Sequence, residues 1–402
     1  MRDSASDSAA SAAISNPQST TGNSLRRVIG VSMMARLVHD TANRFVYPFL
    51  PEIAGGLRIP LDQLGAVLSL RSGVGILSPV FGALSDRIGH RRAMSIGLLV
   101  LAAGLGGVGL AGALGPALLG FSAAGIGTAI YIPALQAYVS ECVPYARRGR
   151  VFGAIELTWA LAGMIGVPLL GRLIGPLSWR APFIALAVTM TISAALTLIL
   201  PEPPATARAR AEPVKLAAIA QKRSAVTLLI AWLLVFFSFE NIQVGYASWF
   251  ESRFELTPVE RGMAQTLFGV FEIVASGSSS LFLDRIGKKR GVTGGLLVAL
   301  LGYALLVLIG PLDVRLGLAA MGVAFLGFEF SVVSGIPILS EQVPQARGTM
   351  LALAVMTSGL GRMAGAVIGG ALVIGPGFTS AAWVSGVVAV GTLALFVWGV
   401  SE

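Results

Sequence analysis

Residues 82–92 of this chain read GALSDRIGHRR, and the part SDRIGHRR returns at residues 283–290 as LDRIGKKR, 198 positions later. A second stretch behaves in the same way, because SECVPYAR at residues 140–147 returns as SEQVPQAR at residues 340–347, 200 positions later. Two separate matches at nearly one offset indicate an internal duplication. The sequence therefore predicts two related halves.

The composition around these repeats is typical of a membrane protein. Of the 402 residues, 55% are hydrophobic and 12% are charged, and the mean hydropathy is +0.79. Apolar runs close to the roughly 20 residues needed to cross a bilayer recur along the whole chain. Five runs are nearly free of charge: 93–113, 181–200, 224–239, 292–310 and 379–400. Seven further runs carry a few polar residues: 28–50, 61–84, 115–139, 151–174, 260–282, 314–339 and 348–373. A β-barrel would need short alternating segments instead, so we predict an all-α membrane protein with twelve transmembrane helices.

The boundaries of the two halves follow from the polar segments. Residues 1–24 are rich in Ser, Ala and Asp and lack the apolar stretch of a signal peptide, which predicts a disordered tail. Residues 201–223 combine prolines with five basic residues and predict a linker. We therefore expect one six-helix bundle over residues 25–200 and a second, pseudosymmetric one over residues 224–402.

The net charge of +9 is explained by its placement along the chain. If the N-terminus is cytoplasmic, nineteen Lys and Arg residues fall on the cytoplasmic side and five on the other. This asymmetry follows the positive-inside rule and predicts that both termini are cytoplasmic. The charge gives no reason to expect a nucleic-acid partner, and the predicted location is the cytoplasmic (inner) cell membrane.

Metal, redox and enzyme chemistry are not indicated. Cys142 is the only cysteine, and the chain has two histidines, so neither an intramolecular disulfide nor a metal site is expected. No pair of nucleophile and base stands out. The sequence therefore predicts no cofactor, and a membrane sensor or an intramembrane enzyme is the least favoured class.

The repeated GALSDRIGHRR stretch resembles the loop between helices 2 and 3 of the major facilitator superfamily, and the resemblance covers the chain from the first helix to the last. It implies the major facilitator fold and a cytoplasmic latch in which Asp86 meets the start of helix 11. The second copy has Ser280 where the first has Gly82, so helix packing there is expected to be looser. The alternative is that these charges only fix topology. The latch residues implied are Gly82, Asp86, Arg87, Gly89, Arg91, Glu141, Arg147, Arg150, Asp284, Arg285, Glu341 and Arg347.

Polar residues inside the predicted spans indicate a central cavity, because a charge at membrane depth requires a partner, water or a function. In helix 1 they repeat at helical spacing and share one face: Arg36, His39, Asp40, Asn43 and Arg44. Arg71 in helix 2 adds a cation. We expect Asp40 to be ionised in a network with these arginines, which either binds substrate or braces the first half.

Four carboxylates are candidates for carrying protons: Glu156, Glu240, Glu272 and Glu329. They have few basic neighbours in sequence, and burial without a cation favours the protonated form that a proton carrier must visit. A structural, hydrogen-bonded role is the alternative for each. Arg362 in helix 11 could meet Glu240, Glu329 or an anionic substrate. The predicted cavity residues are Arg36, Asp40, Asn43, Arg44, Arg71, Tyr131, Glu156, Glu240, Asn241, Glu272, Glu329 and Arg362.

Within the superfamily the chain is most similar to the twelve-helix drug-efflux type, which implies proton-coupled export of amphiphilic compounds. The helix-5 motif of that group is only half retained, since Gly163, Pro168 and Gly171 match and Ala154, Val167 and Arg172 do not. The alternative is an importer or flippase for an anionic metabolite or lipid bound by the embedded arginines. In either case the expected partners are a small-molecule substrate, protons and membrane lipids, and a monomer is sufficient.

Overall fold

The computed structural model describes residues 22–143, 145–201, 219–343 and 347–401. All regular structure in this part of the chain is helical. Most of the predicted tail and linker lies outside these residues. The first half contains α2 (Gly22–Phe45), η1 (Tyr47–Phe49), α3 (Leu50–Leu57), α4 (Leu61–Gly73), η2 (Val74–Leu77), α5 (Ser78–Ile88), α6 (His90–Leu110), α7 (Leu114–Cys142), α8 (Tyr145–Leu161), η3 (Ala162–Gly166), α9 (Val167–Ile174) and α10 (Ala181–Leu198). The second half contains α12 (Arg223–Gln243), α13 (Tyr246–Phe254), α14 (Pro258–Ile286), α15 (Lys288–Leu308), α16 (Val314–Gln342), α17 (Arg347–Ile374) and α18 (Phe378–Gly399).

Ten helical stretches among the described residues are long and apolar enough to cross a membrane. The two remaining predicted spans differ from them for local reasons. Helix α2 carries charged residues along its length. The second span is divided into α4, η2 and α5, with glycines at 73 and 75 and Pro79 in the first turn of α5. The predicted all-α membrane architecture is confirmed.

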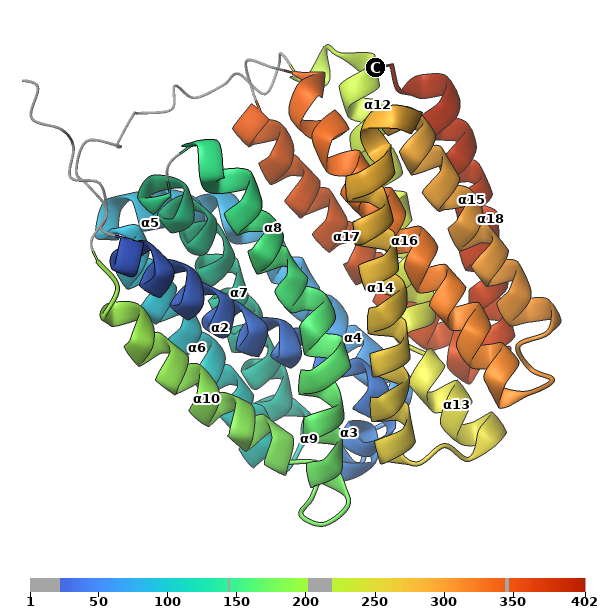
Figure 1. The fold of residues 1–402 in the computed structure, drawn as a ribbon. Helices are drawn as coiled ribbons and strands as arrows, with labels where there is room; N and C mark the ends of the chain where they lie inside the picture. The colour runs from blue at the N-terminus through green and yellow to red at the C-terminus, as the bar shows by residue number, and fades with distance from the viewer. Residues whose placement is uncertain (1–21, 144, 202–218, 344–346, 402) are drawn as a thin grey trace, which may run out of the picture.

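Each half has its own hydrophobic core, formed by buried residues between 28 and 200 and between 219 and 400. Val244 of the second half joins the first of these cores. Figure 1 shows the two groups of helices side by side. Glycines let one helix pair in each half approach closely: a Cβ on Gly104 would lie 2.5 Å from the Ala124 nitrogen, and one on Gly302 would lie 2.4 Å from the Ala324 nitrogen. These two glycines are 198 residues apart, the offset of the sequence repeat.

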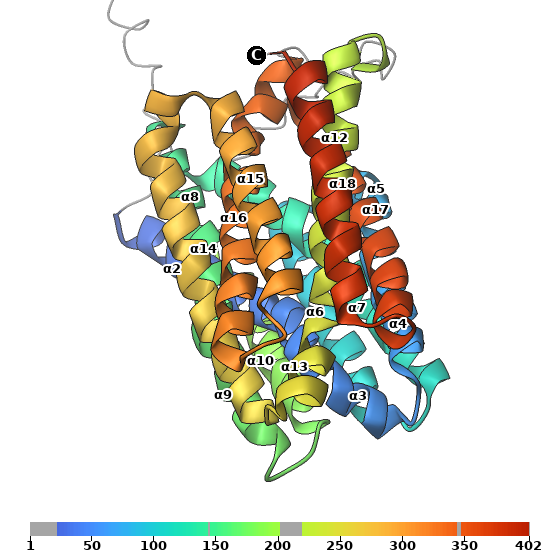
Figure 2. The same ribbon diagram turned by 90° about the vertical axis from the view of Figure 1, so that its right-hand side faces the viewer.

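The two ends of the molecule need separate names. The linker end carries the turns at Gly89 and Gly287 and the C-terminal Ser401, and the far end carries α3 and α13 (Figures 1 and 2). The halves meet where α4 packs on α17 and where α14 packs on η3 and α9. At the first of these contacts Gly65 lies against the backbone of Ala366, where a Cβ would come within 2.9 Å of the carbonyl oxygen.

Candidate functional site

A cavity of about 570 Å³ lies between the two halves. Its walls come from α2, η1, α4, η2, α7 and α8 of the first half and from α17 of the second. Gln136, Leu351 and Val355 line its wall toward the linker end and are exposed, whereas Tyr47 toward the far end is half-buried. The cavity therefore opens at the linker end. Its polar lining residues are Asn43, Tyr47, Arg71, Ser72, Thr128, Gln136, Trp159, Ser358 and Arg362.

Asp40 lies inside the first half and is fully buried. Its carboxylate accepts hydrogen bonds from Arg36 Nε at 3.0 Å and from the Thr158 hydroxyl at 2.8 Å, and it lies 3.0 Å from His39 Nδ1. Because Thr158 belongs to α8, this network braces α2 against α8. The expected network around Asp40 is thus present with Arg36, but the expected pairing with Arg44 is wrong.

Arg44 instead joins the two halves. Its Nη1 donates to both carboxylate oxygens of Glu272 on α14, at 2.7 and 2.6 Å, and the two side chains are only 1% and 3% exposed. Trp159 supports this pair: its Nε1 donates to Glu272 at 3.3 Å, and its ring lies 4.9 Å from the guanidinium carbon of Arg44. Since Trp159 also lines the cavity, the pair lies directly behind the cavity wall.

A second inter-half cluster surrounds Glu240 on α12, which is fully buried. Arg362 Nη1 lies 2.9 Å from one of its carboxylate oxygens, and the Tyr47 hydroxyl of the first half donates to the other at 2.6 Å. Neither Glu240 nor Glu272 is therefore free of cations. The predicted meeting of Arg362 with Glu240 is confirmed. The expectation that both carboxylates lack a cation is wrong, because their partners lie 122 and 228 residues away in sequence.

The remaining candidate residues have different surroundings. Glu329 accepts a hydrogen bond from Ser276 at 3.0 Å, and no cation of the described residues lies within ion-pair distance of it. Glu156 is 58% exposed and lies 3.6 Å from Arg36, so the burial without a cation that was expected for it is wrong. Tyr131 is fully buried beside His39, with ring centroids 5.3 Å apart.

Asn241 is placed in the core of the second half rather than at the cavity. Its side-chain amide donates to the Ala381 carbonyl at 2.7 Å and to the Ser385 hydroxyl at 2.9 Å. Both acceptors belong to α18. Asn241 is not among the residues that line the cavity, so its contacts fix α12 against α18.

The predicted latch lies at the linker end, and only part of it belongs to the described side chains. Gly89 and Gly287 have φ of 92° and 88°, a region that favours glycine, at the start of α6 and α15. Arg91 donates to the Leu200 carbonyl at 2.8 Å, and Arg87 and Arg285 are exposed. The remaining side chains lie outside the described set: Asp86, Arg147, Arg150, Asp284 and Arg347, together with Gly82.

Two acidic latch residues hold equivalent positions in the two halves. Glu141 lies 3.2 Å from His90 Nε2, and Glu341 lies 2.6 Å from Lys288 Nζ. Each pair connects the end of one helix with the start of another in the same half. The described charges of the linker end thus pair within halves.

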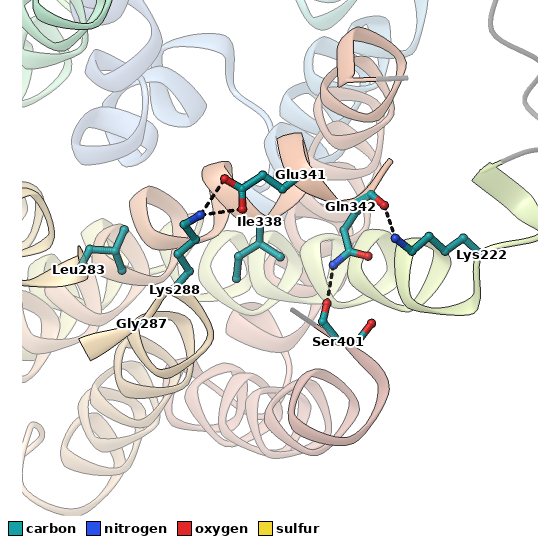
Figure 3. A pocket seen from close by; sticks show the side chains of 8 residues that line it. All are labelled: Lys222, Leu283, Gly287, Lys288, Ile338, Glu341, Gln342 and Ser401. Carbon is teal, nitrogen blue, oxygen red and sulfur yellow. Dashed lines mark hydrogen bonds and ion pairs between the residues drawn. The ribbon is translucent and has the colours of Figure 1, made fainter. Parts of the chain in front are cut away.

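A second pocket, of about 340 Å³, lies at the linker end within the second half (Figure 3). Lys222 donates to the Gln342 carbonyl, Gln342 donates to the Ser401 carbonyl at 2.7 Å, and Lys288 binds Glu341. Its lining residues belong to the second half, apart from Lys222 at the end of the predicted linker, so the pocket does not lie between the two halves. The cavity between the halves is the better candidate for a transport site.

Sequence reasoning missed several side chains at the junction of the halves. Tyr47 donates to Glu240, and Gln265 accepts from Arg44 at 3.3 Å. At the far end Arg261, 1% exposed, binds Glu52 of α3 and lies 3.3 Å from Glu251 of α13. The one available signal was the presence of these polar residues at or near predicted spans, because their partners are far away in sequence.

Comparisons with known proteins agree with this architecture. The sequence profile of the Major Facilitator Superfamily matches residues 32–338 and 228–402. Tetracycline resistance protein, class C, from Escherichia coli is 27% identical over 315 residues, which cover 74% of this chain and 77% of that protein. The class G protein from Vibrio anguillarum is 28% identical over 277 residues, covering 65% and 69%.

Solved structures show the same fold. The nucleoside transporter NupG superposes with a TM-score of 0.75 at 16% identity, and the match covers 93% of this chain and 99% of that one. The predicted resemblance and fold class are confirmed. The chain belongs to the Major Facilitator Superfamily and is a multi-pass membrane transporter.

Proposed function

We propose that this transporter exports a small, partly apolar organic molecule across the cytoplasmic membrane in exchange for protons. The observation that carries the proposal is the Arg44–Glu272 pair, which joins the halves behind a cavity that opens at the linker end. A substrate would enter this cavity from the linker end. The pair would then have to separate before the far end could open.

The direction of transport rests on orientation and on relatives. The excess of basic residues supports a cytoplasmic linker end and cytoplasmic termini. In this orientation the cavity would load from the cytoplasm. Two of the relatives are named as tetracycline resistance proteins. Resistance is what export of a drug would confer.

Glu272 is the proposed proton-coupling residue. When ionised, it holds Arg44 of the other half, and protonation would remove the charge that holds this pair. When the far end is open, Glu272 would be exposed there and would bind a proton. When the far end closes, Arg44 would pair with Glu272 again and the proton would be released. Glu329 is the second candidate because it lies on the neighbouring α16 without a cation partner among the described residues.

The moving bodies in this proposal are the two predicted bundles, residues 25–200 and 224–402, connected by the linker 201–223. One copy of the chain is sufficient, since the cavity is formed by two halves of the same chain. The repeated charges at the linker end, including Asp86 and Asp284, form the cytoplasmic latch when that end closes.

The test is transport by purified protein in liposomes with an acidic lumen. Fluorescent amphiphiles of positive, zero and negative charge should be assayed separately, and at least one should accumulate in the lumen. Release of the pH gradient by a protonophore should abolish accumulation. Glu272→Gln should abolish gradient-driven transport while retaining binding, and Glu255→Gln, at an exposed acid between α13 and α14, should not.

The alternative is import or flipping of an anionic metabolite or lipid. It predicts that substrate leaves an acidic lumen together with protons, or that a labelled lipid changes leaflet without a pH gradient. Either result, with no accumulation of any amphiphile, would overturn the export proposal.

A further inference from the structure

The end of the cavity nearest the far end is formed by two arginines from opposite halves. Arg71 on α4 and Arg362 on α17 both line the cavity. Arg362 binds Glu240, which also accepts from Tyr47. Arg71 donates to Asn43, and both Asn43 and Tyr47 line the same cavity, so these residues form one cluster. The cluster contains two cations and one carboxylate.

Arg71 differs from the other arginines of this region in its partner. Arg36, Arg44 and Arg362 each bind a carboxylate. Arg71 donates to the side-chain oxygen of Asn43, a neutral acceptor. In the described part of the chain no carboxylate lies within ion-pair distance of it.

The charge balance of the cluster is therefore incomplete. Arg362 is neutralised by Glu240, and the charge of Arg71 is left over. An unpaired charge at membrane depth is energetically unfavourable, so such a residue marks a functional site. The planar guanidinium of an arginine is suited to an oxyanion.

The rest of the cavity is suited to an apolar body. Leu68, Ala129, Ile132, Leu351 and Val355 line it. Its volume of about 570 Å³ lies within the range of pockets that hold small organic ligands.

We propose that the substrate carries a carboxylate or a comparable oxyanion on an apolar body, and that Arg71 binds this anionic group. The inference rests on the proposed function and adds the substrate class to it. The charge also agrees with the proposed direction, because an inside-negative membrane potential favours outward movement of an anion.

The test compares two probes that differ in charge and little else. Naphthalene-2-carboxylate and naphthalene-2-carboxamide should be titrated into the purified full-length protein and followed by calorimetry at neutral pH. The carboxylate should bind about tenfold more tightly than the amide, as expected for a hydrogen bond to a charged group. Arg71→Gln should remove this preference and Arg71→Lys should keep most of it.

Arg92→Gln is the matched control, because Arg92 is an exposed cation outside the cavity and its loss changes the net charge equally. Equal affinity for both probes, absence of carboxylate binding, or an unchanged preference in Arg71→Gln would overturn the inference. The export proposal would survive any of these three outcomes if the pH gradient still drives transport of a neutral or cationic amphiphile. A carboxylate preference without any gradient-driven transport would instead overturn export and support this site.

Discussion

The two ends of the molecule use their charges in different ways. At the far end and in the adjoining middle, ion pairs join the halves, as in Arg44–Glu272 and Arg261–Glu52. At the linker end the described pairs, His90–Glu141 and Lys288–Glu341, stay within one half. The first group is buried more deeply than the second.

For the proposed exchange mechanism, this difference predicts which contacts change during transport. Pairs within a half can persist when the halves rotate against each other, whereas pairs between halves must break for the far end to open. The structure thus represents the state that is open at the linker end. Alternating access would exchange the inter-half pairs of the far end for contacts of the latch.

The largest expected effect is at Arg44. Arg44→Gln leaves Glu272 buried without its cation, which should lower the free energy of unfolding by about 3–5 kcal/mol. The far end should also open more often. A cysteine introduced at Met164, which packs on Gly269 between the halves, should then react faster with a maleimide in a Cys142→Ser background.

The control for this prediction is the double variant Arg44→Gln/Glu272→Gln. It removes both charges, so it should recover much of the lost stability. The halves would still lack this contact, so labelling at Met164 should stay faster than in the parent. A single variant as stable as the parent, with unchanged labelling at Met164, would mean that the pair does not hold the halves together.

A smaller effect is expected at the rim of the far end, where one arginine has two carboxylate partners. Glu52 belongs to the first half and Glu251 to the same half as Arg261. Glu52→Gln should lower stability by about 2 kcal/mol and accelerate labelling at Met164, because it weakens a charge-assisted contact between halves. Glu251→Gln should cost less than about 1 kcal/mol, since Glu251 is 47% exposed. Equal labelling in the two variants would contradict the distinction between pairs within and between halves.

Most of the fold could be predicted from the sequence because its signals are local or repeated. Span length, charge asymmetry and the 198-residue repeat depend on composition and order alone. The interruption of the second span between α4 and α5 was not predicted, since glycines and a proline also occur inside intact membrane helices, as Pro133 does in α7.

The site could be predicted only as a set of residues. The face of α2 was evident from its spacing, but the partner of each charge depends on which helices meet. Arg44 is four residues from Asp40 and binds Glu272 on α14 instead. Helical periodicity identifies neighbours on one helix and contains no information about the opposite half.

The start of α14 is a feature of the far end that lies within one half. The Thr257 hydroxyl accepts from the Glu260 nitrogen at 3.3 Å, and the Glu260 carboxylate accepts from the Thr257 nitrogen at 2.8 Å, which forms a capping box at the start of α14. Thr257→Ala should lower the free energy of unfolding by about 1 kcal/mol. Labelling at Met164 should stay at the parental rate, and faster labelling would show that the start of α14 controls opening.

The smallest effect is expected at the linker end, in the Lys288–Glu341 pair. Its side chains are 35% and 51% exposed, so water screens the attraction, and Glu341→Gln should change stability by at most about 1 kcal/mol. Because both residues belong to the second half, labelling at Met164 should also stay unchanged.

The equivalent change in the first half is Glu141→Gln. The side chains of His90 and Glu141 are 11% and 17% exposed, so this change should cost somewhat more stability, again without a change in labelling. Thermal unfolding and maleimide labelling of the same samples measure both quantities. If either variant shifted the labelling rate as strongly as Glu52→Gln, the charges of the linker end would act across the halves, and the contrast between the two ends would not hold.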